Sequence, residues 1–322
     1  MTQTTRFIAG DWGTSNLRLY LCEYEPTAAA TILDTRFGPG ISQIKEDFEG
    51  IFFELTQDWF EQWGKLPVLL SGMIGSTIGW KDAPYLTCPV DASQIATGRV
   101  KFSCRGISFS ILAGLRTQNP LGTPDVMRGE ELQMLGWLRL QSNDSADGTT
   151  RRLFALPGTH NKWTLVENSS ITNFLTAFTG ELFSLLTNHS ILLTNSSTGS
   201  SANSFSQSAF IDGVAAIDSL GDAQLLHALF ATRSKQVLGE MASADASSYL
   251  SGLIIGADVM GASKLFGKVD AVTIIGEPKL TQHYAHALDY FGVASERCDP
   301  SQIAISGFEA IFEHLHEKHK HE

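Results

Sequence analysis

Two short apolar runs near the start of the chain enclose a polar insert. Residues 7–10 (FIAG) and 17–21 (LRLYL) have apolar positions at the spacing of β-strands. The insert is rich in residues that favour turns, namely Asp11, Gly13, Thr14, Ser15 and Asn16. The pattern predicts a β-hairpin whose turn directs backbone N–H groups and two hydroxyls to one point beside a carboxylate, which can hold a phosphate and its metal.

The rest of the first half alternates strand and helix patterns. A strand is predicted over residues 31–37, a helix over 47–63 with its apolar positions on one stripe, and a buried strand over 67–71. Glycine-rich residues 72–79 follow, and a loop-rich section with several prolines leads to Asp125. A second helical pattern begins at Asp125 and runs to about residue 140.

The second half repeats this order after a polar linker at residues 141–150. Strands are predicted over residues 152–156, 162–167 and 171–178, with a turn over 157–161, and helices over 180–193, 208–232 and 245–266. A buried strand over 269–275 and helices that begin at Pro278 and Asp299 complete the chain. The repeated order indicates an internal duplication, with two similar lobes that face a nucleotide.

Composition and charge narrow the class of protein. The 322 residues carry a formal net charge of −11, which argues against non-specific binding to nucleic acid or anionic membranes. Four scattered cysteines without a Cys-x-x-Cys pair suit reduced thiols better than a disulfide framework or a zinc site. No signal peptide is recognisable, and no apolar run approaches the roughly 20 residues that span a bilayer. We expect a soluble, cytoplasmic protein of two domains.

The familiar nucleotide-binding and hydrolase motifs are missing from the sequence. It has no G-x-x-x-x-G-K-[ST], no G-x-G-x-x-G that opens a helix after a strand, and neither G-x-S-x-G nor H-E-x-x-H. Four features remain in order along the chain. They are the first hairpin turn, Asp125, a second hairpin turn at Gly158, Thr159 and His160, and a predicted strand that ends at Gly276.

This order resembles the sugar kinase, Hsp70 and actin superfamily, in which two hairpin turns hold the phosphates and a late glycine turn holds adenosine. Over nearly the whole chain, several blocks closely resemble the 2-dehydro-3-deoxygalactonokinase family. These blocks are residues 11–18 (DWGTSNLR), 71–76 (SGMIGS), 79–85 (GWKDAPY), 125–131 (DVMRGEE), 156–163 (LPGTHNKW) and 179–183 (TGELF).

The resemblance implies an α/β fold with two RNase H-like lobes around a nucleotide cleft, the actin-like ATPase or sugar kinase fold. It implies an N-terminal lobe over residues 1–145, with the first phosphate hairpin, the substrate pocket and the catalytic aspartate. A C-terminal lobe over residues 146–299 would carry the second phosphate hairpin and the adenosine site. The last helix, about residues 300–322, would pack back on the N-terminal lobe.

The activity that the resemblance implies is phosphoryl transfer from ATP, with Mg²⁺, to the terminal (6-) hydroxyl of 2-dehydro-3-deoxy-D-galactonate in galactonate catabolism. Such a reaction needs donors around the phosphates, a metal across them and a carboxylate that takes the hydroxyl proton. Asp125 is the predicted base, although an aspartate after Pro124 could also cap a helix. Arg128 is predicted to bind the substrate carboxylate, the alternative being a salt bridge to Glu130 or Glu131. Glu131 is expected to orient such groups.

Nucleotide and metal contacts are expected from both turns. Asp11 is assigned to Mg²⁺ through water, and its alternative is stabilisation of the turn. His160 is expected to donate to phosphate, unless it is an ordinary turn histidine. The residues predicted to contact the nucleotide are Gly13, Thr14, Ser15, Asn16, Arg18, Gly158, Thr159, His160 and Gly276.

The glycine-rich stretch is expected to form a wall of the substrate pocket, because glycine lets the backbone approach a hydroxylated ligand closely. The alternative is a purely structural role, as a glycine-rich connection after a buried strand. The residues predicted to line the pocket are Gly72, Met73, Ile74, Gly75, Trp80, Tyr85 and Arg128.

Two rival functions remain open at the level of sequence. One is a kinase for another sugar or keto-deoxy acid, and the other is a regulatory ATPase of the same fold that signals to a partner protein. The expected partners are the sugar acid and ATP, without nucleic acid or membrane, and a homo-oligomer is compatible with the sequence.

Overall fold

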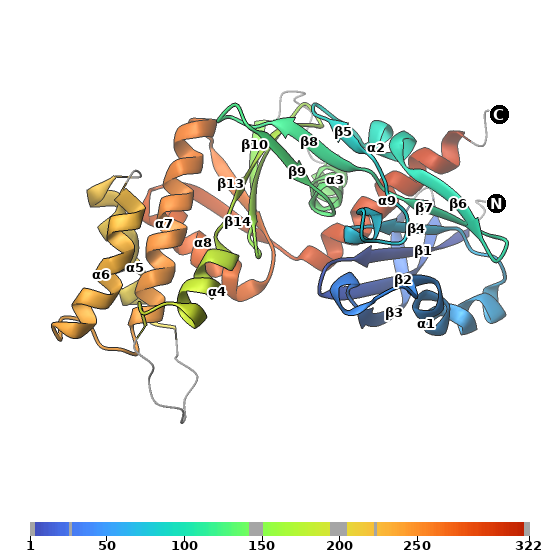
Figure 1. The fold of residues 1–322 in the computed structure, drawn as a ribbon. Coiled ribbons are helices and arrows are strands. Elements are labelled where there is room, and N and C mark those ends of the chain that lie inside the picture. Colours follow the sequence, from blue (N-terminus) through green and yellow to red (C-terminus); the bar gives the residue numbers. More distant parts are fainter. Residues whose placement is uncertain (1–3, 26–27, 142–150, 194–204, 222–223, 319–322) are drawn as a thin grey trace. The chain divides into compact units, whose positions relative to one another are not determined.

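The computed structural model describes residues 4–25, 28–141, 151–193, 205–221 and 224–318 (Figure 1). It divides into two compact units. One comprises Met1–Thr150, Val166–Asn173 and Pro300–Glu322, and the other comprises Arg151–Leu165 and Phe174–Asp299. The predicted boundary near residue 145 and nearly all of the predicted linker lie outside the described residues.

The first unit is built on a six-stranded sheet with the order β3-β2-β1-β4-β7-β6. Its strands are β1 (Thr5–Trp12), β2 (Asn16–Glu25), β3 (Ala28–Pro39), β4 (Val68–Ser71), β6 (Val100–Cys104) and β7 (Ile107–Ile111). The predicted hairpin is confirmed, since β1 and β2 pair antiparallel. β4 runs parallel to β1 and sets Asp11 opposite Ser71, so the predicted metal ligand lies at the start of the glycine-rich stretch.

Helix α1 (Phe48–Trp63) has the predicted bounds, because the cap at Asp47 and the apolar stripe both mark the same segment as a helix. The carboxylate of Asp47 accepts a hydrogen bond from the backbone N of Gly50 at 2.7 Å, a cap that stabilises a helix by about 1 kcal/mol. Phe48, Phe52 and Trp59 are buried against the six-stranded sheet in one hydrophobic core. This helix and the core hold the strands that carry the hairpin.

The section before Asp125 is more regular than predicted. It contains β5 (Tyr85–Thr87), α2 (Ala92–Gly98), β6, β7, β8 (Gly114–Gln118) and β9 (Pro124–Met127). Strands β5, β8 and β9 form a separate three-stranded sheet. β8 and β9 pair across a short loop, and only the β5–β8 pair joins more distant segments. These strands have three to five residues, too few for a clear periodic pattern, so the sequence did not reveal them.

The prediction that Asp125 opens or caps a helix is wrong. Asp125 lies in β9, opposite Thr117 of β8, and helix α3 (Glu130–Gln141) begins only after Gly129. Gly129 has a φ of +111°, a conformation that L side chains rarely adopt, and it turns the chain from strand into helix. Sheet pairing therefore overrides the helical pattern over residues 125–128.

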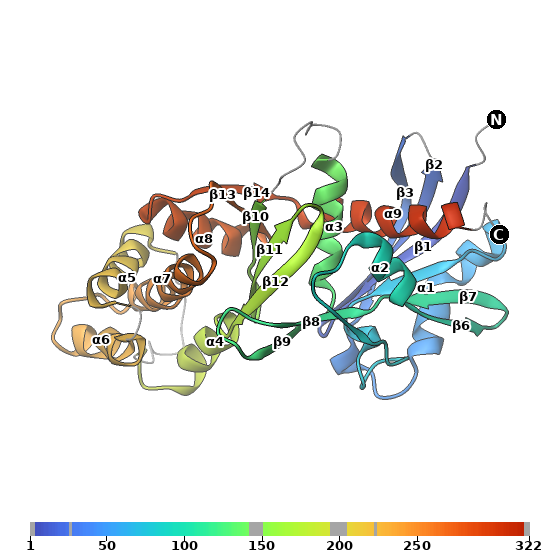
Figure 2. The same cartoon turned by 90° about the horizontal axis from the view of Figure 1, so that it is seen from above.

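Helix α9 (Pro300–Lys318) belongs to the first unit and packs along α3 (Figure 2). The contact is close because glycines face it: a Cβ at Gly136 would lie 1.9 Å from the carbonyl oxygen of Ile303. Arg139 of α3 also donates to Glu309 at 2.8 Å and pairs with Glu313. The last helix thereby anchors α3, whose first turn carries Glu130 and Glu131.

The second unit is built on a sheet that repeats that of the first, although Val166–Asn173, at the connection of β11 and β12, is grouped with the first unit. Its five strands, in the order β12-β11-β10-β13-β14, are β10 (Arg151–Leu156), β11 (Asn161–Glu167), β12 (Ser170–Ala177), β13 (Ala271–Ile275) and β14 (Ala294–Cys298). In both sheets the first strand lies between the second and the fourth, and the third lies beyond the second. The predicted internal duplication is therefore confirmed.

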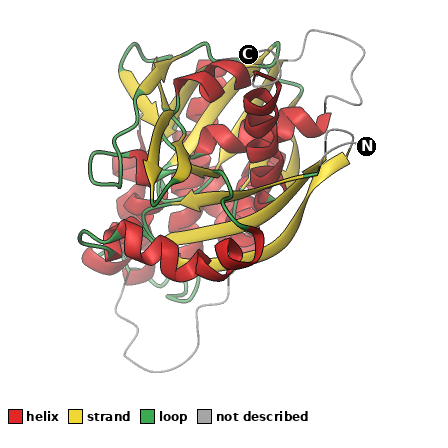
Figure 3. Cartoon of the chain, turned by 90° about the vertical axis from the view of Figure 1, so that its right-hand side faces the viewer, coloured by secondary structure: helices red, strands yellow, loops and turns green. Residues whose placement is uncertain are grey.

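Five helices belong to the described part of this unit, as the labels of Figure 1 show, and Figure 3 distinguishes the helices of the chain from its strands by colour. The five helices are α4 (Gly180–His189), α5 (Gln207–Leu220), α6 (Leu225–Val237), α7 (Ala246–Phe266) and α8 (Pro278–Tyr290). The single helix predicted over residues 208–232 is wrong, because α5 ends at Gly221, which has a φ of +83°. In the described part of the chain, no helix is both long and apolar enough to cross a membrane.

Candidate active site

The turn of the first hairpin exposes two adjacent amides. The carbonyl oxygens of Gly13 and Thr14 accept hydrogen bonds from the backbone N–H groups of Ile41 and Ser42, at 3.1 and 3.0 Å. In contrast, no hydrogen bond among the described residues uses the amide of Thr14 or Ser15, and both residues are exposed. Two N–H groups and two hydroxyls are thus available to an anion, as the sequence predicted.

Residues 40–43, which orient this turn, were not predicted as part of the site. Gly40 N donates to the carbonyl of Ser15, and a Cβ at Gly40 would lie 2.3 Å from the carbonyl carbon of Ser15. Only glycine therefore allows this approach. The Gly-Pro-Gly signal at residues 38–40 could have indicated a close backbone contact.

Asp11 lies at the end of β1, with about a third of its side chain exposed. Burial raises the pKa of its carboxyl, Arg18 lowers it, and the nearby Glu130 raises it further. Nη1 of Arg18 is 3.7 Å from Oδ2 of Asp11. A partly exposed carboxylate beside free amides fits Mg²⁺ held through water and phosphate.

The turn between β9 and α3 packs on the strand beside Asp11. A Cβ at Gly129 would lie 3.3 Å from the Cα of Gly72, the residue after Ser71. Glu131, which is completely buried, links the two segments: Oε2 accepts from Gly129 N at 2.7 Å, and Oε1 lies 3.4 Å from the hydroxyl of Ser71. Glu131 therefore ties the turn that carries Arg128 to the strand next to the predicted metal ligand.

Burial, together with the neighbouring carboxylate of Glu130, raises the pKa of Glu131 from 4.5 to about 8. Between these values the folded protein holds a proton that the unfolded chain has lost. The bound proton adds to the free energy of unfolding. This contribution is fully present below about pH 4.5, falls by about 1.4 kcal/mol per pH unit above it, and is lost as the pH rises through about 8. Glu131→Gln keeps an oxygen that can accept from Gly129 N and removes the titrating group, so we expect it to flatten the pH profile of the unfolding free energy.

Urea unfolding from pH 5 to 8.5 measures this effect. The exposed Glu54→Gln is the matched control and should leave the wild-type slope unchanged. Parallel profiles for the wild type and Glu131→Gln would show that the buried carboxyl is ionised in the folded protein.

The guanidinium of Arg128 is buried, and no ion pair joins it to a carboxylate among the residues that the structure describes. Nη2 donates to the carbonyl of Ala83 at 2.7 Å, whereas Nε and Nη1 have no hydrogen-bond partner. The group stacks 4.3 Å above the ring of Tyr85, and a Cβ at Gly75 would come within 2.9 Å of Nη1. The alternative salt bridge to Glu130 or Glu131 is not formed in the described structure; only the backbone N of Arg128 bonds to Glu130.

The predicted pocket wall divides into two groups. Gly72, Gly75 and Tyr85 adjoin Arg128 or its turn, as described above. The side chain of Ile74 is fully buried in the core, and the ring of Trp80 packs on Phe109 with centroids 5.1 Å apart. The side chains of Ile74 and Trp80 therefore pack in the hydrophobic core that supports the predicted wall.

Asp125 lies in β9, partly exposed, and Nδ2 of Asn119 donates to its Oδ2 at 3.3 Å. Glu130, at the start of α3, accepts a hydrogen bond from the backbone N of Arg128 at 3.1 Å. Its charge acts on both Asp11 and Glu131. The sequence analysis did not single out Glu130 for chemistry, although the acidic pair at residues 130–131 was visible.

The second hairpin turn is held by the start of α4. The carbonyl of Thr159 accepts from Glu181 N at 2.8 Å, and Nε2 of His160 lies 2.6 Å from Oε2 of Glu181. The imidazole also stacks on Phe178, with ring centroids 5.5 Å apart. His160 is therefore oriented by a carboxylate and a ring that the sequence analysis did not identify, although Glu181 lies in the block at residues 179–183.

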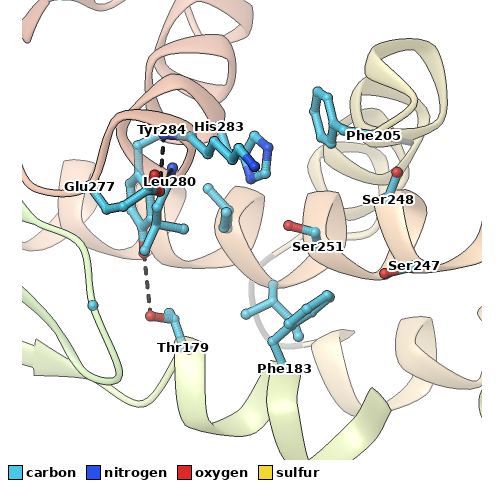
Figure 4. Close-up of a pocket in the computed structure, with 15 residues that line it drawn as sticks. Thr179, Phe183, Phe205, Ser247, Ser248, Ser251, Glu277, Leu280, His283 and Tyr284 are labelled. Atoms are coloured by element: carbon cyan, nitrogen blue, oxygen red, sulfur yellow. Dashed lines mark hydrogen bonds between the residues drawn. The ribbon is translucent and has the colours of Figure 1, made fainter. Parts of the chain in front are cut away.

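A cavity of about 340 Å³ opens beside the second turn (Figure 4). Gly158 and Thr179 line it near the turn. Glu277, the cap of α8, and His283 of α8 line a second side, and Ser251 lines it from α7. The ring of Phe205 stacks on His283 with centroids 4.1 Å apart. Gly276 directly precedes the lining residue Glu277, and a Cβ at Gly276 would lie 3.1 Å from the carbonyl oxygen of Pro157. The cavity is large and apolar enough to accept a nucleoside.

Proteins of one family match nearly the whole chain. The model of the 2-keto-3-deoxy-galactonokinase family matches residues 11–311. The chain is 32% identical over 302 residues to 2-dehydro-3-deoxygalactonokinase of Escherichia coli (strain K12), with 94% of each chain covered. It is 31% identical over 312 residues to a probable 2-dehydro-3-deoxygalactonokinase of Rhizobium meliloti (strain 1021), covering 96% of this chain and 97% of the relative.

A solved structure is also similar over nearly the whole chain. A crystal structure from Sinorhizobium meliloti, provisionally described as a 2-dehydro-3-deoxygalactonokinase, aligns with a TM-score of 0.83 and 29% identity. The alignment covers 96% of this chain and 99% of that one. The predicted actin-like ATPase or sugar kinase fold is confirmed. The chain belongs to the 2-dehydro-3-deoxygalactonokinase family.

Proposed function

We propose that the protein transfers a phosphoryl group from ATP to the 6-hydroxyl of 2-dehydro-3-deoxy-D-galactonate, giving the 6-phosphate. The observation that carries this proposal is the buried Arg128 guanidinium, whose Nε and Nη1 lack partners. A buried cation without an anion is costly, whereas the carboxylate of a sugar acid would supply the missing acceptors. A neutral sugar would leave the charge uncompensated.

The surroundings of the other site residues in the first unit support the following roles. The amides and hydroxyls of Thr14 and Ser15, with Gly13 and Asn16, would bind phosphate oxygens, and Arg18 would offset developing negative charge. Asp11 would hold Mg²⁺ through water, and Mg²⁺ supplies charge neutralisation to the phosphates when bound. Gly72, Met73 and Gly75 would line the sugar backbone.

We propose Asp125 as the carboxylate that takes the proton from the 6-hydroxyl. Glu130 is a second candidate, because its charge reaches Asp11 and it lies in the turn that carries Arg128. A base must lie within hydrogen-bond reach of the hydroxyl in the bound substrate. Amide variants of both residues distinguish the two assignments.

The second unit would bind the rest of ATP. Gly158, Thr159 and His160 would contact the β- or γ-phosphate, and the cavity between α7 and α8 would receive adenosine, with Gly276 directly before its lining residue Glu277. Glu277 accepts from the backbone N of Lys279 and of Leu280, so these amides of α8 are already occupied. The demand for ATP and the free cysteines suit a cytoplasmic location.

ADP release with Mg·ATP tests the proposal on a panel of 2-keto-3-deoxy acids, their neutral analogues and common hexoses. We expect saturable turnover with the galactonate-derived acid and none with an analogue that lacks the carboxylate. Turnover with a neutral hexose alone would reassign the substrate. Steady ATP hydrolysis that no acceptor stimulates would favour the regulatory ATPase.

A further inference from the structure

One carboxylate in the second unit joins three elements and has no part in the chemistry proposed above. Asp258 lies on α7. Its Oδ2 accepts hydrogen bonds from Nδ2 of Asn161 at 2.8 Å and from the hydroxyl of Tyr284 at 2.7 Å. Its Oδ1 accepts from Nε1 of Trp163 at 2.8 Å. All three donors are at most 1% exposed.

The three donors come from both sides of the proposed nucleotide site. Asn161 directly follows His160, the last residue of the second phosphate turn, and Trp163 continues the same strand, β11. Tyr284 lies on α8 and lines the cavity, where its hydroxyl is also 3.4 Å from Oγ1 of Thr179 (Figure 4). Thr179 in turn precedes the helix that holds the turn.

The carboxylate is thus the common acceptor for the phosphate turn and the cavity wall. Hydrogen bonds to an ionised acceptor are short and directional, so they fix the donors more tightly than neutral contacts would. Burial raises the pKa of Asp258, while the bonds from Tyr284, Trp163 and Asn161 lower it. Burial is the larger effect, so the pKa of Asp258 lies above its usual value, and the three hydrogen bonds offset part of this rise.

We propose that Asp258 is a positioning residue of the nucleotide site, which sets the affinity for ATP by holding Asn161 at the phosphate turn and Tyr284 in the cavity wall. This inference rests on the proposed nucleotide function of that cavity. Asp258 touches neither substrate. Its loss should act through the geometry of the residues that it holds.

Steady-state kinetics of Asp258→Asn test the inference. The amide replaces one acceptor with a donor that faces other donors, so we expect the KM for ATP to rise about tenfold or more. The KM for the keto-deoxy acid, whose proposed contacts lie in the first unit, should change less than twofold. The matched control is Asp218→Asn, because Asp218 is an exposed carboxylate of α5 that also accepts from a tyrosine, Tyr290, at 3.3 Å. It should leave both constants unchanged.

A purely structural role would lower the unfolding temperature of Asp258→Asn without changing the KM for ATP, and this result would overturn the inference. If that variant does not fold, Tyr284→Phe removes only one donor and keeps the ring. We then expect a KM for ATP at least threefold above the wild type, and an unchanged value would overturn the inference equally.

A second variant separates this inference from its premise. Ser251→Phe fills the cavity from α7 and keeps Asp258 and all three of its donors. If Ser251→Phe leaves the KM for ATP unchanged, the cavity does not bind the nucleotide and the premise fails. If Ser251→Phe raises that KM but Asp258→Asn does not, the nucleotide site stands and only the role of Asp258 is overturned.

Discussion

Asp125→Asn should fold, retain ATP binding and lose about 10²–10⁴-fold in kcat, the usual contribution of a positioned general base. The substitution keeps the size of the side chain and an oxygen that can accept from Asn119, so β9 should remain paired with β8. Only the ability to take a proton is lost. Single-turnover kinetics with saturating Mg·ATP measure the chemical step directly.

Glu130→Gln is the informative companion to this variant. If Asp125→Asn keeps near-normal turnover and Glu130→Gln loses it, the base is Glu130 at the start of α3. The exposed Asp82→Asn, in the same unit, controls for a general loss of negative charge. Normal turnover in both amide variants would remove both carboxylates from the base role.

Arg128→Met should raise the KM for the keto-deoxy acid about a hundredfold, because two charge-assisted hydrogen bonds are together worth about 3 kcal/mol. The same variant should not lower the unfolding temperature of the free protein. Methionine replaces a buried cation whose Nε and Nη1 have no partner, and such replacements are often neutral or stabilising. A higher KM for the acid with an unchanged unfolding temperature would indicate that Arg128 binds the substrate and does not stabilise the fold.

Arg116→Met is the matched control. Arg116 lies on β8, which pairs with the strand directly before Arg128. It is exposed and donates through Nε to the hydroxyl of Thr87. It should leave the KM for the acid unchanged. A KM for Arg128→Met within threefold of the wild type, or a collapse of its unfolding temperature, would show that Arg128 supports the fold and does not bind the substrate.

Local patterns predicted the parts of this protein whose structure depends on neighbouring residues. The β1–β2 hairpin follows from alternating apolar positions and a turn-rich insert, and α1 follows from its Asp47 cap and apolar stripe. The duplication was visible because the same order of patterns occurs twice. The ordered motif blocks indicated the family that the whole-chain comparisons then showed.

Strand pairing and other tertiary contacts decided the features that local patterns did not predict. Asp125 resembles the start of a helix in sequence, yet β8 pairs with residues 124–127 and Gly129 delays the helix. Residues 40–43 support the phosphate turn only because β3 returns beside β2. The sequence by itself therefore determined the family, the duplicated fold and the residue types of the site. Only the tertiary structure decided which side chains are buried with unpaired atoms, as Nε and Nη1 of Arg128 are, and which share one acceptor, as the three donors to Asp258 do. The reason is that burial and hydrogen bonding depend on contacts between residues far apart in the chain.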